Sequence, residues 1–287
     1  MNILVIAGHP ADMFDHCGGT LMHHIQHGDK VTCVSLTQGL RIHDEVISDV
    51  FRNHIHEYTE EQIKQLQQDR LKVKYAEVIK ACNLFGIEDV RFLDYDDEIL
   101  TLNAEIISRT AKLIRDVQPQ ILITHWPYQY GGVENHHALT GKIALAAKTA
   151  AASVNFEDRQ PAARIAQTFF MLSPHDCSSF SLLGSDQLAH ATHYVDVSDV
   201  VDLKIKAVEA MASQKYNIPG YARRTVERWA GTFGTRVRVP YAEAFAVEFP
   251  EVSNLLPLSD HRLWLATADE HEILSKYSRE VIEDPSK

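Results

Sequence analysis

Histidine and aspartate recur in this chain at spacings that suit a metal ion. Of its 287 residues 16 are histidine, the side chain that ligates metals most often in proteins. His9 and Asp12 follow the apolar run of residues 2–7, and His136 opens a later amphipathic segment. Two imidazoles and one carboxylate leave a coordination position open for water or substrate, as a catalytic zinc site requires. We therefore predict one divalent ion, zinc before manganese or cobalt, held by His9, Asp12 and His136, with His137 as the neighbour able to replace His136.

Short apolar runs predict the strands that position these residues. Such runs are almost wholly apolar, as strands covered on both faces are, and they comprise residues 2–7, 30–36, 89–93 and 120–124. Helical patterns separate them at residues 18–27, 59–85 and 103–116. This alternation predicts right-handed βαβ crossovers and a doubly wound, Rossmann-like α/β fold with a mostly parallel sheet. Ligands bind such sheets at the carboxyl ends of the strands, where the three proposed metal ligands would meet.

The second half of the sequence continues the pattern without a Gly/Ser-rich linker. An Ala-rich helix after residue 136 precedes candidate strands at 166–172 and 192–197 and a helix at 201–215. We predict one domain over residues 1–257, including an Arg-rich C-terminal part, and a C-terminal helical extension as a tail over residues 258–287.

Composition and charge narrow the range of partners. Lys and Arg number 28 against 39 Asp and Glu, which gives a net charge of -11 and no general footprint for a phosphate backbone. No apolar run near the start approaches the roughly 20 residues of a membrane span, and no basic segment precedes one. The four cysteines lack a C-x-x-C spacing, which favours reduced thiols over a disulfide framework. We expect a cytoplasmic protein that binds neither nucleic acid nor membrane.

Arginines gather in one stretch of this acidic chain. Five lie within sixteen residues, namely Arg223, Arg224, Arg228, Arg236 and Arg238. A solvated helix face is one interpretation; capture of carboxylate or phosphate by bidentate guanidinium contacts is the other. We predict a small anionic carboxylate substrate, bound within one subunit or by a neighbour in a homo-oligomer. The candidate substrate-binding residues are Arg41, Arg223, Arg224, Arg228, Arg238 and Tyr128.

Two motifs resemble those of the PIG-L/LmbE-like family of zinc-dependent N-deacetylases of sugar conjugates. The family motif A-H-P-D-D-E, followed by G-G-T, stands here as GHPADM at residues 8–13 and GGT at 18–20. Its second motif, H-P-D-H-x-A, falls on VENHHA at residues 133–138. The resemblance covers roughly residues 1–215 and implies a Rossmann-like fold. The zinc ligands that it implies are His9, Asp12 and His136.

Two departures from the family pattern concern the deacetylation chemistry. In the deacetylases the first Asp of H-P-D-D is the general base, and the first His of H-P-D-H assists as acid or oxyanion stabiliser. These positions are Ala11 and Val133 here, and neither side chain can move a proton. Because each general acid or base is worth roughly 10²–10⁴ in rate, the sequence is poorly equipped for amide hydrolysis by this route.

A hydratase branch of the same fold shares the alanine before the metal-binding aspartate. The sequence resembles zinc hydratases of the 4-oxalomesaconate hydratase type, and this resemblance extends to about residue 257. The matching segments are residues 124–125, 173–175, 207–211 with Gln214, and 241–245. The acidic G-E-R-G-E segment of that branch reads GLRIH at residues 39–43. The resemblance implies a zinc-dependent hydratase of a small unsaturated oxo-polycarboxylic acid in aromatic-compound catabolism.

Hydration of a conjugated double bond needs an acid and a base beside the metal. His175 follows a predicted strand and is our first choice, and His125 is a second partner or proton shuttle. His43 and Glu45 come from the loop after the second strand, where a substituted acid or base would lie. For each of these four residues, the alternative interpretation is an ordinary polar side chain in a loop, without a catalytic role. Two other functions stay open: an amidohydrolase with its base relocated to Asp15, His43 or Glu45, and a non-catalytic metal- or ligand-binding relative.

Overall fold

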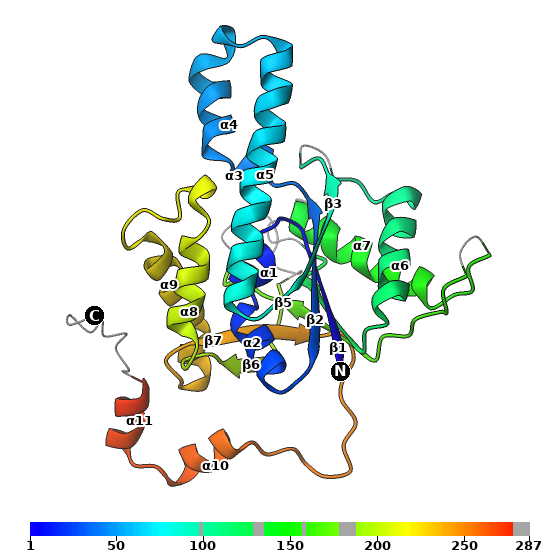
Figure 1. Ribbon diagram of the computed structural model, residues 1–287. Coiled ribbons are helices and arrows are strands. Elements are labelled where there is room, and N and C mark those ends of the chain that lie inside the picture. The colour runs from blue at the N-terminus through cyan, green and yellow to red at the C-terminus, as the bar shows by residue number, and fades with distance from the viewer. Residues whose placement is uncertain (98–99, 129–134, 157–158, 178–187, 278–287) are drawn as a thin grey trace.

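A seven-stranded mixed sheet forms the centre of the molecule (Figure 1). The computed structural model describes residues 1–97, 100–128, 135–156, 159–177 and 188–277. The strand order is β3-β2-β1-β4-β5-β7-β6, and the first five strands are parallel while β7 and β6 each pair antiparallel to their neighbour. The strands are β1 (Asn2–Ala7), β2 (Lys30–Thr37), β3 (Asp89–Tyr95), β4 (Ile121–His125), β5 (Gln167–Met171), β6 (His193–Asp196) and β7 (Ala242–Val247). The predicted α/β fold with a mostly parallel sheet is confirmed.

Alternate residues of the central strand serve two separate cores. Ile3 and Val5 belong to a core under α1 (Asp12–Asp15), α2 (Gly18–Gln26), α5 (Glu60–Leu84), α8 (Val201–Glu209) and α9 (Tyr221–Val237). Leu4 and Ile6 belong to the opposite core, under α6 (Ala104–Val117) and α7 (His136–Ala151). Side chains of a strand alternate between faces, so a strand covered on both sides must be apolar throughout. This explains the unbroken apolar run at the start of the sequence.

Side-chain caps fix where the long helices begin. Thr59 and Gln62 form a reciprocal capping box before α5, while Asn103 and Asn135 accept backbone N–H groups at the starts of α6 and α7. Each cap satisfies a backbone donor that the helix leaves without an internal partner. The Asn135 cap matters most for the site because α7 begins directly at His136 and His137.

A helical hairpin rises beyond the carboxyl end of the sheet (Figure 1). It consists of α3 (Leu40–His43), α4 (Glu45–Asp49), a π-helical turn (Val50–His54), a 3-10 turn (Ile55–Glu57) and the first part of α5. Since α3 follows β2, this hairpin brings residue 43 to the strand ends. In the described part of the chain, no helix is long and apolar enough to cross a membrane.

The C-terminal third differs in detail from the sequence prediction. The helix predicted over 201–215 ends at Glu209, and residues 212–214 form a separate 3-10 turn. The Arg-rich part contains α9 and also β7, a strand that the sequence analysis did not identify. The described tail forms two short helices, α10 (Asp260–Thr267) and α11 (Glu270–Tyr277).

Candidate metal centre and adjoining pocket

Close contacts at two glycines, Gly141 and Gly8, bring the candidate metal ligands together. A Cβ atom at Gly141 of α7 would lie 2.4 Å from the carbonyl oxygen of His125, so only glycine lets α7 approach the end of β4 this closely. A Cβ atom at Gly8 would lie 3.1 Å from Oγ1 of Thr140. The carboxyl ends of β1 and β4 and the start of α7 therefore meet around one small volume.

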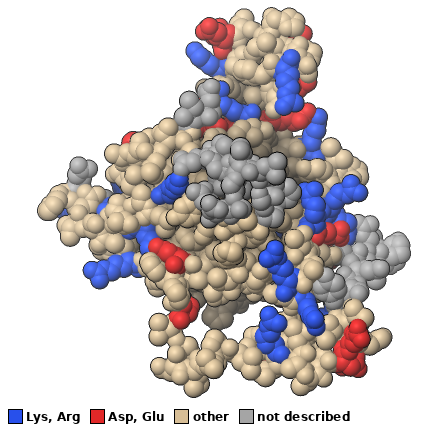
Figure 2. Space-filling model, turned by 180° about the vertical axis from the view of Figure 1, so that it is seen from behind, with Lys and Arg blue, Asp and Glu red and all other residues tan. Residues whose placement is uncertain are grey.

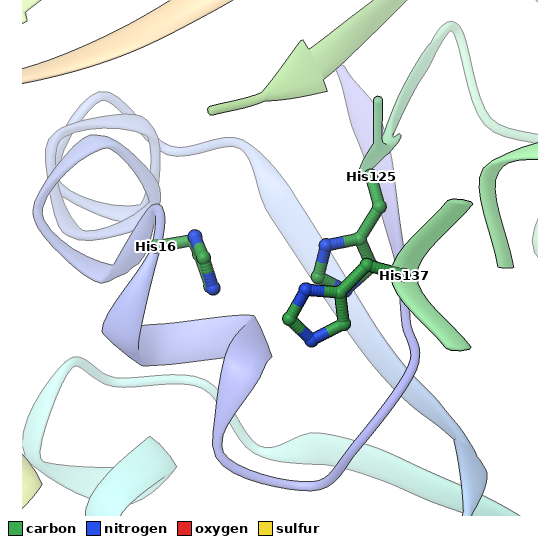
Figure 3. A group of neighbouring side chains, drawn as sticks. All are labelled: His16, His125 and His137. Carbon is green, nitrogen blue, oxygen red and sulfur yellow. The ribbon is translucent and has the colours of Figure 1, made fainter. Parts of the chain in front are cut away.

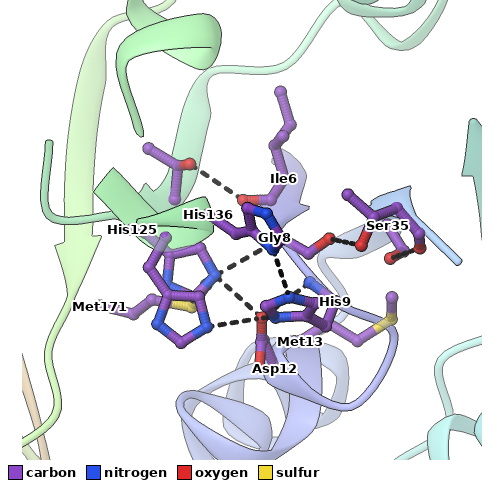
Figure 4. A network of polar contacts seen from close by, with 12 residues as sticks. Ile6, Gly8, His9, Asp12, Met13, Ser35, His125, His136 and Met171 are labelled. Carbon is purple, nitrogen blue, oxygen red and sulfur yellow. Dashed lines mark hydrogen bonds and ion pairs between the residues drawn. The ribbon is translucent and has the colours of Figure 1, made fainter. Parts of the chain in front are cut away.

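One carboxylate oxygen stands at the centre of the cluster (Figure 4). Oδ2 of Asp12 lies 3.2 Å from Nδ1 of His9, 3.2 Å from Nε2 of His125 and 3.2 Å from Nε2 of His137. The backbone N–H of His9 also donates to it at 2.8 Å. Burial raises the pKa of Asp12, but the imidazoles of His137 and His9 outweigh burial and hold that pKa well below its usual range. The carboxylate is thus ionised at neutral pH.

Two groups of side chains have the chemistry and spacing to hold a metal ion. The ligand atoms of His9, Asp12 and His137 all lie within 4.8 Å of one another, and so do those of His16, His125 and His137 (Figure 3). Two imidazoles and a carboxylate fit zinc in the first group. The sequence analysis preferred His136 as third ligand. Nδ1 of His136 lies 3.2 Å from Nε2 of His9. The other ring nitrogen of His9, Nδ1, is the one that faces Asp12. His137, in contrast, contacts Asp12 directly.

His125 is a neutral, tightly held imidazole. The backbone N–H of Gly8 donates to its Nε2 at 3.1 Å, and its ring stacks on His137 at a centroid distance of 4.1 Å and an interplanar angle of 6°. Burial, together with the charge of His137, lowers the pKa of His125 to about 4. The same Nε2 lies 3.2 Å from Oδ2 of Asp12, so this nitrogen faces both a donor and an acceptor. Both groups share His137, and the first, His9, Asp12 and His137, also supplies a carboxylate; we call it the metal cluster.

The hairpin places His43 against the same centre. Its ring lies 4.7 Å from that of His9, and Nζ of the buried Lys74 donates to its carbonyl oxygen at 3.0 Å. Asp97 accepts the backbone N–H groups of residues 40–42, which fixes the start of α3. Burial, and then the charge of His9, lowers the pKa of His43 to about 4.

Two other residues predicted from the same loop are engaged elsewhere. Glu45 forms an ion pair with Lys215, which follows α8. Arg41 pairs with Asp96 through Nε at 2.6 Å and Nη2 at 2.9 Å, and both side chains are exposed. Of the three candidates from the loop after β2, only His43 contacts the metal cluster through a described interaction.

A cavity of about 130 Å³ adjoins the metal cluster. His137 lines both, and the cavity is also walled by His16, Tyr128, His175, Asp176 and Trp229. The Trp229 ring lies 5.4 Å from the His16 ring and 6.0 Å from the His175 ring. His16 is buried, and its Nδ1 has no hydrogen-bond partner among the described residues. The predicted residues His175 and Tyr128 thus share one pocket with His16, Asp176 and Trp229, which the sequence analysis did not select.

The predicted arginine clamps lie outside this pocket. Among the described residues that line it there is no arginine or lysine. Arg223 contacts Glu227 one turn along α9 at 3.3 Å, while Arg224 and Arg228 are exposed on the same helix. Arg238 lies beyond α9 in a cavity shared with α11. On the face drawn in Figure 2 the basic side chains gather mainly along the right-hand side, with a few acidic ones among them.

Known proteins with similar sequences fall into two enzyme classes. The chain is 25% identical over 264 residues to a 4-oxalmesaconate hydratase of Pseudomonas putida, covering 88% of this chain and 91% of that protein. It is 26% identical over 215 residues to a diacetylchitobiose deacetylase of Thermococcus kodakarensis, covering 74% of this chain and 69% of that protein.

Solved structures show the same fold. The crystal structure of GalB, the 4-carboxy-2-hydroxymuconate hydratase of Pseudomonas putida, aligns with a TM-score of 0.67 at 22% identity, covering 89% of this chain and 99% of that one. The N,N'-diacetylchitobiose deacetylase of Pyrococcus horikoshii aligns with a TM-score of 0.66 at 20% identity, covering 86% and 83%. The family model described as PIG-L, GlcNAc-PI de-N-acetylase, matches residues 4–148, half of the chain. With the fold and the His–Asp cluster at the strand ends, this match establishes that the chain belongs to the PIG-L family.

Proposed function

We propose that this PIG-L family protein is a metal-dependent hydratase, a lyase that adds water to or removes it from a small unsaturated oxo-polycarboxylic acid in aromatic-compound catabolism. The observation that carries the proposal is the exchange of one side chain beside the metal cluster. Ala11 is buried and apolar where the deacetylase motif has its general base, and His43 supplies an imidazole 4.7 Å from the His9 ring. Similarity to a hydratase over 88% of the chain supports the same reaction class.

The metal that we propose is zinc, held by His9, Asp12 and His137. His136 is the alternative third ligand, because it also contacts His9. When bound, zinc supplies the positive charge that polarises the oxo group of such a substrate. The ionised Asp12 suits this role, since it supplies the one negative charge of the ligand set.

Hydration breaks an O–H bond of water and the π bond of the alkene, forms a C–O bond at one alkene carbon and forms a C–H bond at the other. We assign His43 to accept the proton from water, because its ring faces the metal cluster. We assign His175, on the wall of the adjoining pocket, to deliver a proton to carbon. Arg224 and Arg228 are exposed and available to substrate carboxylates, within this copy or a neighbouring one.

Amide hydrolysis with a relocated base is the second candidate. The adjoining pocket has an aromatic wall formed by Trp126 and Trp229, and none of the described residues lining it is arginine or lysine. Such a lining favours a neutral acetamido group over a polyanion. His43 and the half-buried Asp15, whose pKa is raised to about 6 by desolvation, are the candidate bases for this reaction.

A two-substrate assay separates these functions. Zinc-loaded protein is supplied with enoic oxo-diacids and triacids, whose conjugated ultraviolet band disappears on hydration, and separately with N-acetylglucosamine conjugates, from which acetate is measured. We expect loss of the ultraviolet band without acetate release, and His43→Ala should slow it by roughly 10²-fold or more. Acetate release with every enoic acid unchanged would establish the amidohydrolase instead.

A further inference from the structure

An exposed apolar segment connects β7 with α10. We call residues 248–259 the C-terminal arm; it loops away from the sheet before returning to the helices of the tail (Figure 1). Within it Val252 is 95% exposed, Leu255 81%, Leu256 96% and Leu258 64%. Scattered exposed leucines are ordinary on a protein surface, but four large, exposed aliphatic side chains within seven residues are a concentration of the kind that marks an interaction site.

Both ends of the arm are held on its own chain. Nε2 of Gln167 donates to the carbonyl oxygen of Phe249 at 2.9 Å and to Oε1 of Glu251 at 2.7 Å. Beyond the arm, Nε2 of His261 contacts the carbonyl oxygen of Val237 at 2.6 Å. Leu255 and Leu256 lie in the chain between these two hydrogen-bonded ends. The arm is therefore a tethered loop with an apolar tip, not a free end.

The same chain carries an open apolar pocket. A cavity of about 230 Å³ lies on the face of the sheet beside α2, and Ile121, Ile123, Phe169 and Phe245 form much of its wall. Thr20, His24 and His193 also line it. The apolar residues come from β4, β5 and β7, and the arm directly continues β7.

We propose that the arm of one copy packs into this pocket of a second copy of the chain, and that the exchange is reciprocal. A chain that carries both an apolar tip and an apolar recess is self-complementary, which is what a two-fold interface requires. An aliphatic side chain offers on the order of 100 Å² of apolar surface. Two arms with four large aliphatic residues each, and the surfaces that they cover, reach roughly 1,600 Å² in total, the size of a stable interface.

Mass measurement in solution tests the exchange without any assay of activity. Size-exclusion chromatography with light scattering should give twice the 32.4 kDa chain mass for the wild type, and 32.4 kDa for the Leu255→Asp, Leu256→Asp double variant. Val154→Asp is the matched control, because Val154 is 77% exposed in the connection after α7 and should leave the dimer intact. A monomeric wild type, or a dimer that survives the double variant with the same dissociation constant, overturns the proposal.

Crosslinking identifies the surface on which the arm packs. Chains carrying only Leu256→Cys are mixed with tagged chains carrying only His193→Cys, and a disulfide between the two kinds of chain is expected. His193 lines the pocket and is exposed. A second experiment uses a single chain that carries both Leu256→Cys and His193→Cys. A disulfide that forms only within this double variant would show that the arm packs on the pocket of its own chain. No disulfide in either experiment would show that the arm packs elsewhere, and either result contradicts the proposal.

Discussion

At the residue scale, Asp12 organises the site because one of its oxygens faces three imidazoles. The motif search identified His9 and Asp12 from their spacing, since both follow a strand that the apolar pattern predicts well. It chose His136 and kept His137 as the alternative, because adjacent residues at the start of a helix differ only by the rotation of the first turn. Trp229 and His16 gave no sequence signal, because neighbours from distant segments define their role.

Lys74 provides a prediction about pH. It is fully buried, and burial lowers its pKa to about 8 from 10.5. Between these values the unfolded chain binds more protons than the folded one, so the contribution of Lys74 to stability rises with pH in this window. Relative to Lys74→Met, the wild type should gain about 1–2 kcal/mol in free energy of unfolding from pH 8 to pH 10, measured by urea denaturation. An equal pH dependence of the two proteins would show that Lys74 keeps an ordinary pKa.

At the element scale, apolar runs predicted the first six strands to within one or two residues, whereas β7 was not recognised. Its sequence AEAFAV contains three alanines and a glutamate, residues with weak strand preference. Pairing with β5 and β6 decides the structure there. The glutamate, Glu243, is buried and bonded to Lys204 at 2.7 Å and to the backbone N–H groups of Gly19 and Thr20. Local sequence could not reveal this arrangement, because its partners lie some 40 to 220 residues away.

Breaking this buried pair should be costly. Glu243→Leu leaves the ammonium of Lys204 buried and unpaired, so we expect a loss of about 3–5 kcal/mol in the free energy of unfolding. Adding Lys204→Met removes the unpaired charge and should restore much of that loss. Urea denaturation of the single and double variants measures both effects. A single variant as stable as the wild type would mean that the pair does not hold α2 and α8 to β7.

The contact of α7 with β4 gives a prediction about the site. Gly141→Ala brings a Cβ atom against the carbonyl oxygen of His125, so α7 must move and carry His137 with it. We expect a loss of about 1–3 kcal/mol in stability together with weaker zinc binding in a chelator competition. Gly231→Ala in α9 is the control, since its Cβ would come no closer than 4.0 Å to another atom. It should leave zinc affinity unchanged, and equal zinc affinities for both variants would contradict the role of this contact.

At the scale of the whole molecule, the site combines residues inside the family match with residues beyond its C-terminal end. His9, Asp12 and His137 lie within residues 4–148, whereas His175, Asp176 and Trp229 of the adjoining pocket lie beyond it. The metal cluster therefore lies within the family match, whereas the pocket combines residues inside it, such as His16 and His137, with residues beyond it. We expect the shared part to set the metal and the later part to set the substrate.

Replacing the tryptophan tests this division. Trp229→Ala removes the ring beside His16 and His175, so KM for the substrate should rise by about 10-fold or more while zinc content stays at the wild-type value. Trp264→Ala, on α10 in a different cavity, is the matched control and should change neither quantity. Loss of zinc in Trp229→Ala would show that the pocket and the metal cluster are not separable.

Zinc analysis of two adjacent variants tests the metal centre most directly. Wild-type protein, His136→Ala and His137→Ala are purified, loaded with zinc and dialysed, and zinc per chain is measured by elemental analysis. Because His137 reaches Asp12 at 3.2 Å, we predict about one zinc in the wild type and in His136→Ala, and at least a 10-fold weaker affinity in His137→Ala. Full zinc content in His137→Ala with loss in His136→Ala, or a wild type that binds none, would contradict the site described for this protein.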